Sequence, residues 1–265
     1  MGTHSIIHSR AFNHFDLGSG TESYVNYHPR GTGANTATGA TVFGEVRVSR
    51  ELLDGNVPGQ HSVFFRAGHL RVPKSLPEAL ERCGYEFDSS FTAPDVLTNF
   101  PYALTLGLGF DDDSGLYEFP VTIEDEEEPP LFDRVSSAID VFRANADNGA
   151  ISVVLIHPTD AKMKLEAERN MLDRLPPGVV AMDPLGFAQF WRARDRLEWS
   201  VEPGSKPRTL VLRAASHEPV RGITFEFAGE IAAVSAGAER LEDRHRIVLH
   251  SLDAGKQTQI ELSLR

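Results

Sequence analysis

The first residues of the chain that could carry chemistry are two histidines, His4 and His8, in the run HSIIH. Imidazole nitrogens are common ligands of zinc-like metals. A spacing of four places two side chains on one face of a helical turn, where both could reach one cation. Taken alone, this spacing is also typical of surface and capping histidines, so the pair needs support from other residues.

Three further polar residues follow short apolar runs. Arg66 ends SVFFR, Asp88 ends YEFD, and His157 follows VVLI. Functional groups in βα folds gather where strands end, and a histidine in such a place can act as a general acid. The structural alternatives are a surface arginine that closes a strand, a helix-capping aspartate and a hydrogen-bonded, half-buried histidine.

The elements that must position these residues alternate between apolar strands and amphipathic helices. This alternation predicts an α/β fold with a parallel sheet or βα barrel. We expect strands in residues 62–68, 85–91, 116–125 and 151–158, and helices in residues 41–55, 75–83, 131–149, 160–175 and 187–196, with Ser75 as an N-cap. Residues 14–40 predict a long loop. Short strand-like runs after residue 196 predict a small antiparallel β-sandwich.

Composition excludes several classes of function. The net charge of -12 argues against a protein that tracks nucleic-acid phosphates or adheres to anionic lipid. The single cysteine, Cys83, excludes an internal disulfide.

We find no membrane span and no signal peptide, which predicts a soluble protein, cytoplasmic as written and exported if an upstream leader exists. The acidic run EDEEEPP, residues 124–130, predicts a solvated loop.

Taken in order along the chain, HSIIH, FFRAG, GYEFDSS and VVLIHP resemble the motifs of the polysaccharide deacetylase family. Its catalytic part is the NodB homology domain, as in carbohydrate esterase family 4. The resemblance implies an α/β fold of the distorted, incomplete βα-barrel type for residues 1–196, with residues 197–265 as a β-sandwich accessory domain. It also implies a divalent metal, usually zinc, and an N-acetylated sugar or polymer as the substrate.

Roles follow residue by residue from the resemblance. His4 and His8 correspond to the paired metal ligands, and Arg66 corresponds to the arginine that orients the catalytic base. Asp88 corresponds to the acidic residue of the fourth motif. His157 corresponds to the proton donor to the leaving amine, and Leu155 to a residue that lines the pocket for the acetyl methyl group.

The sequence departs from the family in two respects. FRAGH lacks the proline and aromatic residue that follow the arginine, and DSS lacks the usual tryptophan, so we expect a differently shaped groove. The Asp-Asp motif that precedes the histidine pair, and that carries the base and a metal ligand, is absent. Asp111, Asp112 and Asp113 in GFDDDSG are weak substitutes for it, as are Asp16 and Glu22.

The sequence therefore predicts a metal-dependent carbohydrate N-deacetylase-like hydrolase of non-peptide C–N bonds, impaired by loss of the Asp-Asp motif and binding metal weakly. One alternative is a non-catalytic carbohydrate-binding protein, and another is a hydrolase of a small non-sugar amide. If the first barrel strands are missing, an unpaired sheet edge would favour a homo-oligomer that covers it.

Overall fold

The computed structural model describes residues 2–33, 36–109 and 112–265. The chain forms two compact units, Met1–Ala181 and Met182–Arg265. This division falls before helix α6 (Pro184–Asp195), whereas the sequence prediction placed the boundary after residue 196. The helix belongs to the second unit because Ala193 and Phe190 pack into the core of that unit.

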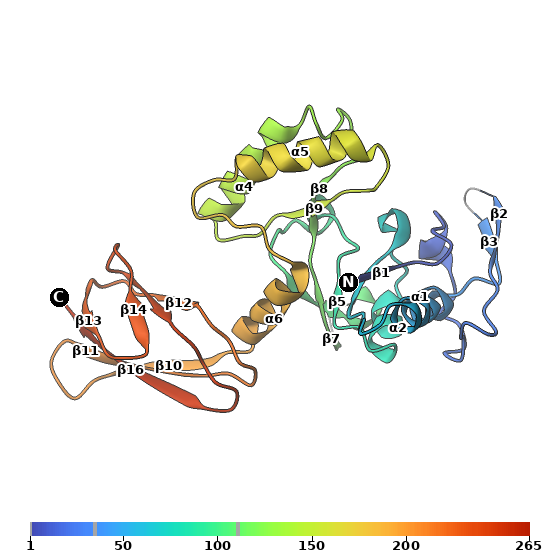
Figure 1. Ribbon diagram of the computed structural model, residues 1–265. Coiled ribbons are helices and arrows are strands. Elements are labelled where there is room, and N and C mark those ends of the chain that lie inside the picture. Colours follow the sequence, from blue (N-terminus) through green and yellow to red (C-terminus); the bar gives the residue numbers. More distant parts are fainter. Residues whose placement is uncertain (1, 34–35, 110–111) are drawn as a thin grey trace. The chain divides into compact units, whose positions relative to one another are not determined.

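The first unit is built on a mostly parallel sheet with the order β1-β4-β5-β7-β6, of which Figure 1 labels β1, β5 and β7. Its strands are β1 (Gly2–His4), β4 (Phe64–Arg66), β5 (Phe87–Asp88), β7 (Asp113–Glu118) and the antiparallel β6 (Tyr102–Thr105). A parallel pair, β8 (Val121–Glu124) and β9 (Val153–Leu155), follows, and a β-bridge joins Thr92 to Val121. The described strands do not close into a barrel, and among them β1 pairs only with β4.

The helices of the first unit are α1 (Val42–Asn56), α2 (Leu76–Arg82), α3 (Ala93–Val96), α4 (Val135–Asp147) and α5 (Ala161–Asp173), with the 3-10 turns η1 (Phe12–His14), η2 (Gly68–Leu70) and η3 (Leu106–Leu108). These α-helices, except the short α3, lie where the sequence predicts a helix. Helices α1 and α2 share a core with strands of the five-stranded sheet, and α4 and α5 share a second core with β8. Helix α1 begins where the Thr41 side chain accepts a hydrogen bond from the Gly44 N–H. In the described ranges, no helix has both the length and the apolar character of a membrane span.

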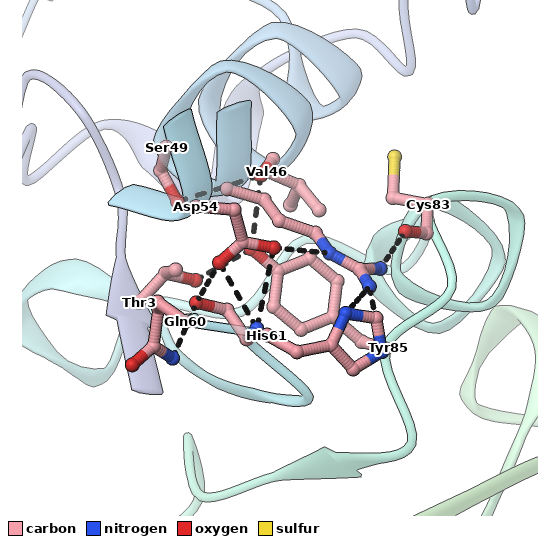
Figure 2. Close-up of polar contacts among 10 residues, drawn as sticks. Thr3, Val46, Ser49, Asp54, Gln60, His61, Cys83 and Tyr85 are labelled. Atoms are coloured by element: carbon pink, nitrogen blue, oxygen red, sulfur yellow. Dashed lines mark hydrogen bonds and ion pairs between the residues drawn. The ribbon is translucent and has the colours of Figure 1, made fainter. Parts of the chain in front are cut away.

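A polar network inside the first unit fixes the edge strand β1 against α1 and the segment after α2 (Figure 2). The Thr3 hydroxyl lies 2.6 Å from the Tyr85 hydroxyl, which donates to the Val46 carbonyl at 3.1 Å. Thr3 is buried and its neighbour His4 is exposed, as expected for successive residues of a strand. The anchoring of Thr3 therefore sets the side of the sheet on which His4 lies.

Several local predictions need correction. HSIIH is not a helical turn, because β1 ends at His4 and a bend follows, with His8 at φ 48°. Ser75 precedes α2 but makes no side-chain capping bond. Residues 116–125 are two strands rather than one, and residues 14–40 contain a hairpin of β2 (Arg30–Gly33) and β3 (Thr36–Thr38). In each of these segments, packing against other parts of the fold decides the backbone conformation, and the local sequence pattern does not.

The second unit contains two antiparallel sheets and α6. One sheet has the order β10-β11-β16-β13 and the other has the order β12-β15-β14. Their strands are β10 (Glu198–Pro203), β11 (Thr209–Ala215), β12 (Ile223–Glu226), β13 (Ile231–Val234), β14 (Ala238–Arg240), β15 (Arg246–Leu249) and β16 (Gln257–Leu264). Buried residues of both sheets, among them Leu212, Ile260 and Ile247, form one core. The sheet-rich tail predicted from the sequence is therefore present.

Candidate active site

The carboxyl ends of the parallel strands carry the candidate residues. His4 of β1 pairs in register with Arg66 of β4, and Glu124 of β8 pairs with Leu155 of β9. Because parallel strands end at the same edge of a sheet, these side chains gather at one place. A cavity of about 220 Å³ lies there, lined by His4, Arg10, Arg66, Ala67, His69, Leu70, Arg71, Glu124, Glu126, Leu155 and His157. Four of the six residues predicted from the sequence line it.

Among the residues that line this cavity, His157 makes a well-defined contact with Asp125, a buried residue that does not itself line the cavity. The Asp125 carboxylate lies 2.7 Å from His157 Nδ1 and accepts the His157 backbone N–H at 2.8 Å. Lys164 Nζ, from α5, forms an ion pair with the same carboxylate at 2.5 Å. The Asp125 side chain is inaccessible to solvent. Two N–H groups and an ammonium therefore hold one buried carboxylate against the imidazole.

The electrostatics of this contact decide the state of Asp125. Burial by itself would raise the pKa of Asp125, but the hydrogen bonds from Lys164 and His157 lower it below its usual value. An ionised carboxylate only accepts hydrogen bonds, so Nδ1 of His157 carries the shared proton. This arrangement leaves Nε2 as the nitrogen that can exchange a proton with a substrate.

Arg66 is held in the cavity wall by the segment after β5. Its Nε donates to the Ser89 carbonyl at 2.8 Å and its Nη2 donates to the Ser89 hydroxyl at 2.6 Å. Burial lowers the pKa of Arg66, and nearby carboxyl groups oppose that shift. The guanidinium stays charged, because an arginine side chain does not lose its proton in proteins. It therefore supplies a fixed positive charge beside His4.

Asp88 lies away from the cavity lining, fully buried against Glu118 of the neighbouring strand. The Ser90 hydroxyl donates to Asp88 Oδ1 at 2.6 Å, and the Phe91 N–H donates to Glu118 Oε1 at 3.0 Å. Burial raises the pKa of Asp88 to about 6, and burial together with the charge of Asp88 raises that of Glu118 well above its usual value. In this position Asp88 supports the Ser89–Ser90 segment that holds Arg66.

The histidine pair lies beside a third imidazole. The rings of His4 and His8 are 4.8 Å apart between centroids, and the rings of His8 and His69 are 4.2 Å apart. Partial burial of the ring, together with the nearby His8 and Arg66, lowers the pKa of His4 to about 4. Its imidazole is therefore neutral at pH 7, the form that binds metals.

The donor set does not yet amount to a catalytic metal centre. Such a centre takes three protein ligands and an open position. Within residues 2–33, 36–109 and 112–265, no three His, Cys, Asp or Glu side chains are arranged to hold an ion. The histidine pair supplies two nitrogens of the right chemistry and lacks a converged third donor, so we derive no reaction step through a metal.

Sequence reasoning missed the residues that complete the cavity. Asp125 and Glu124 belong to the acidic run that predicted a solvated loop, yet Asp125 is buried and Glu124 lines the cavity. The position of the acidic run could have indicated a functional role, because the run directly follows a strand, as His157 does. Of the weak substitutes for the Asp-Asp motif, Asp111 lies outside the described residues, and Glu22 bonds to the Thr41 hydroxyl at the start of α1.

Comparisons with known proteins give only distant likenesses. No protein-family profile matches the chain, and no curated protein matches it. The crystal structure of Agd3, described as a novel carbohydrate deacetylase, is similar with a TM-score of 0.45 and 11% identity, over 84% of this chain and 42% of that one. A candidate polysaccharide deacetylase from Mycobacterium smegmatis is similar with a TM-score of 0.36 and 18% identity, over 69% and 66%.

The chain thus spans less than half of the length of the first of these proteins. Both TM-scores lie below 0.5, so the functional assignment rests on the residues of the cavity.

Proposed function

We propose that the first unit is a carbohydrate N-deacetylase-like hydrolase that cleaves the amide C–N bond of an N-acetylated sugar. The observation that carries the proposal is the buried Asp125 carboxylate held against His157 in the cavity that also contains His4 and Arg66. A histidine fixed in this way is suited to protonate a leaving nitrogen. Leu155, on the cavity wall, would contact the acetyl methyl group.

The cavity also contains a carboxyl group suited to the role of base. Glu124 is half-buried, and burial with the neighbouring Glu127 and Glu126 raises its pKa above the usual value. A raised pKa improves a carboxylate as a proton acceptor near neutral pH. In this proposal Glu124 takes the role of the base that the resemblance assigns to the Asp-Asp motif.

The proton balance of the proposed hydrolysis is complete. Glu124 takes a proton from water as its oxygen bonds to the amide carbon, and the Arg66 charge stabilises the negative oxygen that develops. His157 enters the step as an imidazolium that Asp125 stabilises, and it gives its Nε2 proton to the amine as the C–N bond breaks. Acetic acid and a free amino sugar are the products, and acetic acid loses its proton to water to become acetate. Proton exchange with water then returns Glu124 to the carboxylate and His157 to the imidazolium.

A divalent metal, with zinc as the chemical class, belongs to the proposal as well. When bound it would polarise the amide carbonyl and lower the pKa of water. His4 and His8 are the residues of this chain that would hold it. Because no converged third ligand is described, we expect weak metal binding and slow turnover.

The test measures acetate released from N-acetylglucosamine oligomers, with and without added Zn²⁺, by the full chain and three variants. H157A and E124Q should lower the rate by about 10²–10⁴-fold, as expected for a general acid or base. H250A, in an exposed position of the second unit, is the matched control and should leave the rate unchanged. A rate unaffected by both cavity variants contradicts the proposal.

Binding without hydrolysis is the second candidate function, and it is favoured because no third metal donor joins His4 and His8 among the residues that the structure describes. It predicts that the oligomers bind the chain, as seen by changes in NMR chemical shifts, and release no acetate with or without metal. Release of amine from small non-sugar amides alone would instead indicate the third possibility, a hydrolase of small amides.

A further inference from the structure

We propose that the N-acetylated sugar bound by the first unit carries a negatively charged substituent, a carboxylate or a phosphate, which Arg10 and Arg71 bind beside the reacting acetamide. The inference rests on the proposed function for the place of the acetamide, and it adds the chemical class of the substrate. Both arginines line the cavity that also contains Arg66 and His157.

The cavity lining is richer in positive charge than the chain as a whole. The chain has 38 acidic residues and 26 lysines and arginines, for a net charge of -12. The lining reverses this ratio, because it includes three arginines and two glutamates. An arginine side chain does not lose its proton in proteins, so all three charges persist at any working pH. A concave surface lined in this way attracts an anion to a protein that is acidic overall.

The three arginines differ in how far the protein itself uses their N–H groups. Arg66 donates to both the carbonyl and the hydroxyl of Ser89. Across residues 2–33, 36–109 and 112–265, the side chains of Arg10 and Arg71 form neither a hydrogen bond nor an ion pair, and both are exposed. Each of these two guanidinium groups therefore keeps all of its donors, in the planar fork that matches a carboxylate or a phosphate.

The two glutamates of the lining do not neutralise these two arginines. The Glu126 carboxylate lies 3.7 Å from His157 Nδ1. Within the described part of the chain, neither Glu126 nor Glu124 forms an ion pair with Arg10 or Arg71. An anionic substituent can therefore bind both guanidinium groups without displacing a carboxylate of the protein.

Packing fixes the backbone at both arginines. Arg10 lies two residues before Phe12, whose side chain is fully buried in the core. Arg71 follows the turn η2, where its N–H donates to the Gly68 carbonyl at 3.1 Å. The backbone thus holds each arginine at the cavity, and only its side chain has to turn to meet a ligand.

The segment that carries Arg10 and the turn that precedes Arg71 are also tied together. The Gly68 N–H donates to the Ser5 hydroxyl at 3.0 Å. A Cβ on Gly68 would lie 2.6 Å from Ser5 Oγ and 3.2 Å from the His8 Cα, so a larger residue does not fit this approach without a shift. Two segments about 60 residues apart in sequence therefore present their arginines to one cavity.

The experiment measures binding to the full chain by calorimetry, and it does not depend on hydrolysis. The first probe is a tetrasaccharide of alternating glucuronic acid and N-acetylglucosamine, and its neutral match is the same tetrasaccharide with the carboxylates reduced to alcohols. A second pair, N-acetylglucosamine 6-phosphate and N-acetylglucosamine, distinguishes a phosphate from a carboxylate. At least one charged probe should bind about 10-fold or more tightly than its neutral match, as hydrogen bonds between charged groups allow. This preference should weaken as salt is added.

Three double variants test the assignment. R10A/R71A should abolish the preference for the charged probe, and R10K/R71K should keep part of it, because lysine retains the charge and loses the fork. R30A/R169A removes two exposed arginines of the first unit that lie outside the lining, and so the same amount of charge, and should keep the full preference. Because the exchanged side chains are exposed, all three variants should keep the wild-type melting temperature.

Equal affinity of each charged probe and its neutral match, or no binding of any probe, overturns the inference. A preference that survives R10A/R71A overturns it as well. Binding of a charged probe that depends on both arginines, with no acetate release, would leave the inference standing and refute the hydrolase proposal. Acetate release at equal rates from the charged tetrasaccharide and from its neutral match would refute the inference and leave the hydrolase proposal standing.

Discussion

The carboxylate of Asp125 accepts hydrogen bonds from both the backbone N–H and the ring Nδ1 of His157, residues 32 positions apart on neighbouring parallel strand ends. The double contact sets the ring orientation as well as its tautomer. Four predictions concern this contact and three other buried residues of the first unit, Glu118, Gly68 and Glu45.

The first prediction concerns the stability of the fold at acidic pH. Because the folded-state pKa of Asp125 is depressed, its stabilisation is fully present above the unfolded value of about 3.9 and is lost as the pH falls through the lower folded value. The free-energy difference between the wild type and D125N, measured by urea unfolding, should therefore be large at pH 7 and shrink below pH ~4. A difference that does not depend on pH would contradict the ionised contact.

The second prediction concerns Glu118, whose pKa is raised in the fold. A raised carboxyl pKa makes stability fall as pH rises from the unfolded value of about 4.3 towards the folded value. E118Q removes that loss, so its stability relative to the wild type should increase as the pH rises above about 4.3. The control is E81Q, at an exposed position, for which urea unfolding should show no such trend.

The third prediction concerns Gly68, where the turn after β4 meets the segment from Ser5 to His8. G68A should destabilise the fold by about 1–3 kcal/mol, because a Cβ there meets Ser5 and His8. G55A, where a Cβ on helix α1 meets nothing within 4 Å, should instead stabilise by about 0.5–1 kcal/mol. Chemical denaturation of the two variants checks both signs, and equal effects would refute the close approach.

The fourth prediction concerns Glu45, a buried carboxylate of helix α1. It accepts the Ile7 N–H at 3.0 Å and the Tyr27 hydroxyl at 2.7 Å, and so holds the segment between His4 and His8. A glutamine replaces one of these two acceptor oxygens with an NH₂ donor, so it cannot accept both hydrogen bonds in the present geometry.

We therefore expect E45Q to destabilise the chain by about 1–3 kcal/mol. It should also broaden the NMR signals of the His4 and His8 rings. E78Q removes only an exposed ion pair with Arg82 and should cost less than about 0.5 kcal/mol. Sharp, unshifted histidine signals in E45Q would show that Glu45 does not position the segment.

Sequence alone determined much of the first unit. Helices α1, α4 and α5 follow from apolar periodicity, and the strand ends at Arg66 and before His157 follow from apolar runs. These elements are predictable because each depends on which face of a short segment is buried. The gathering of Arg66 and His157 was likewise expected from strand ends, whereas His4 was joined to them only through the family resemblance, because HSIIH was interpreted as a helical turn.

The tertiary structure decided what local patterns could not. Asp125 lies in an acidic run typical of a solvated loop, and only the pairing of β8 with β9 brings it against His157 and Lys164. His69 meets His8 because Gly68 lets two distant segments touch. Asp88 lies at a strand end as predicted, but neighbouring strands bury it against Glu118. Each of these contacts joins residues at least 30 positions apart, so no periodicity within one segment could predict it.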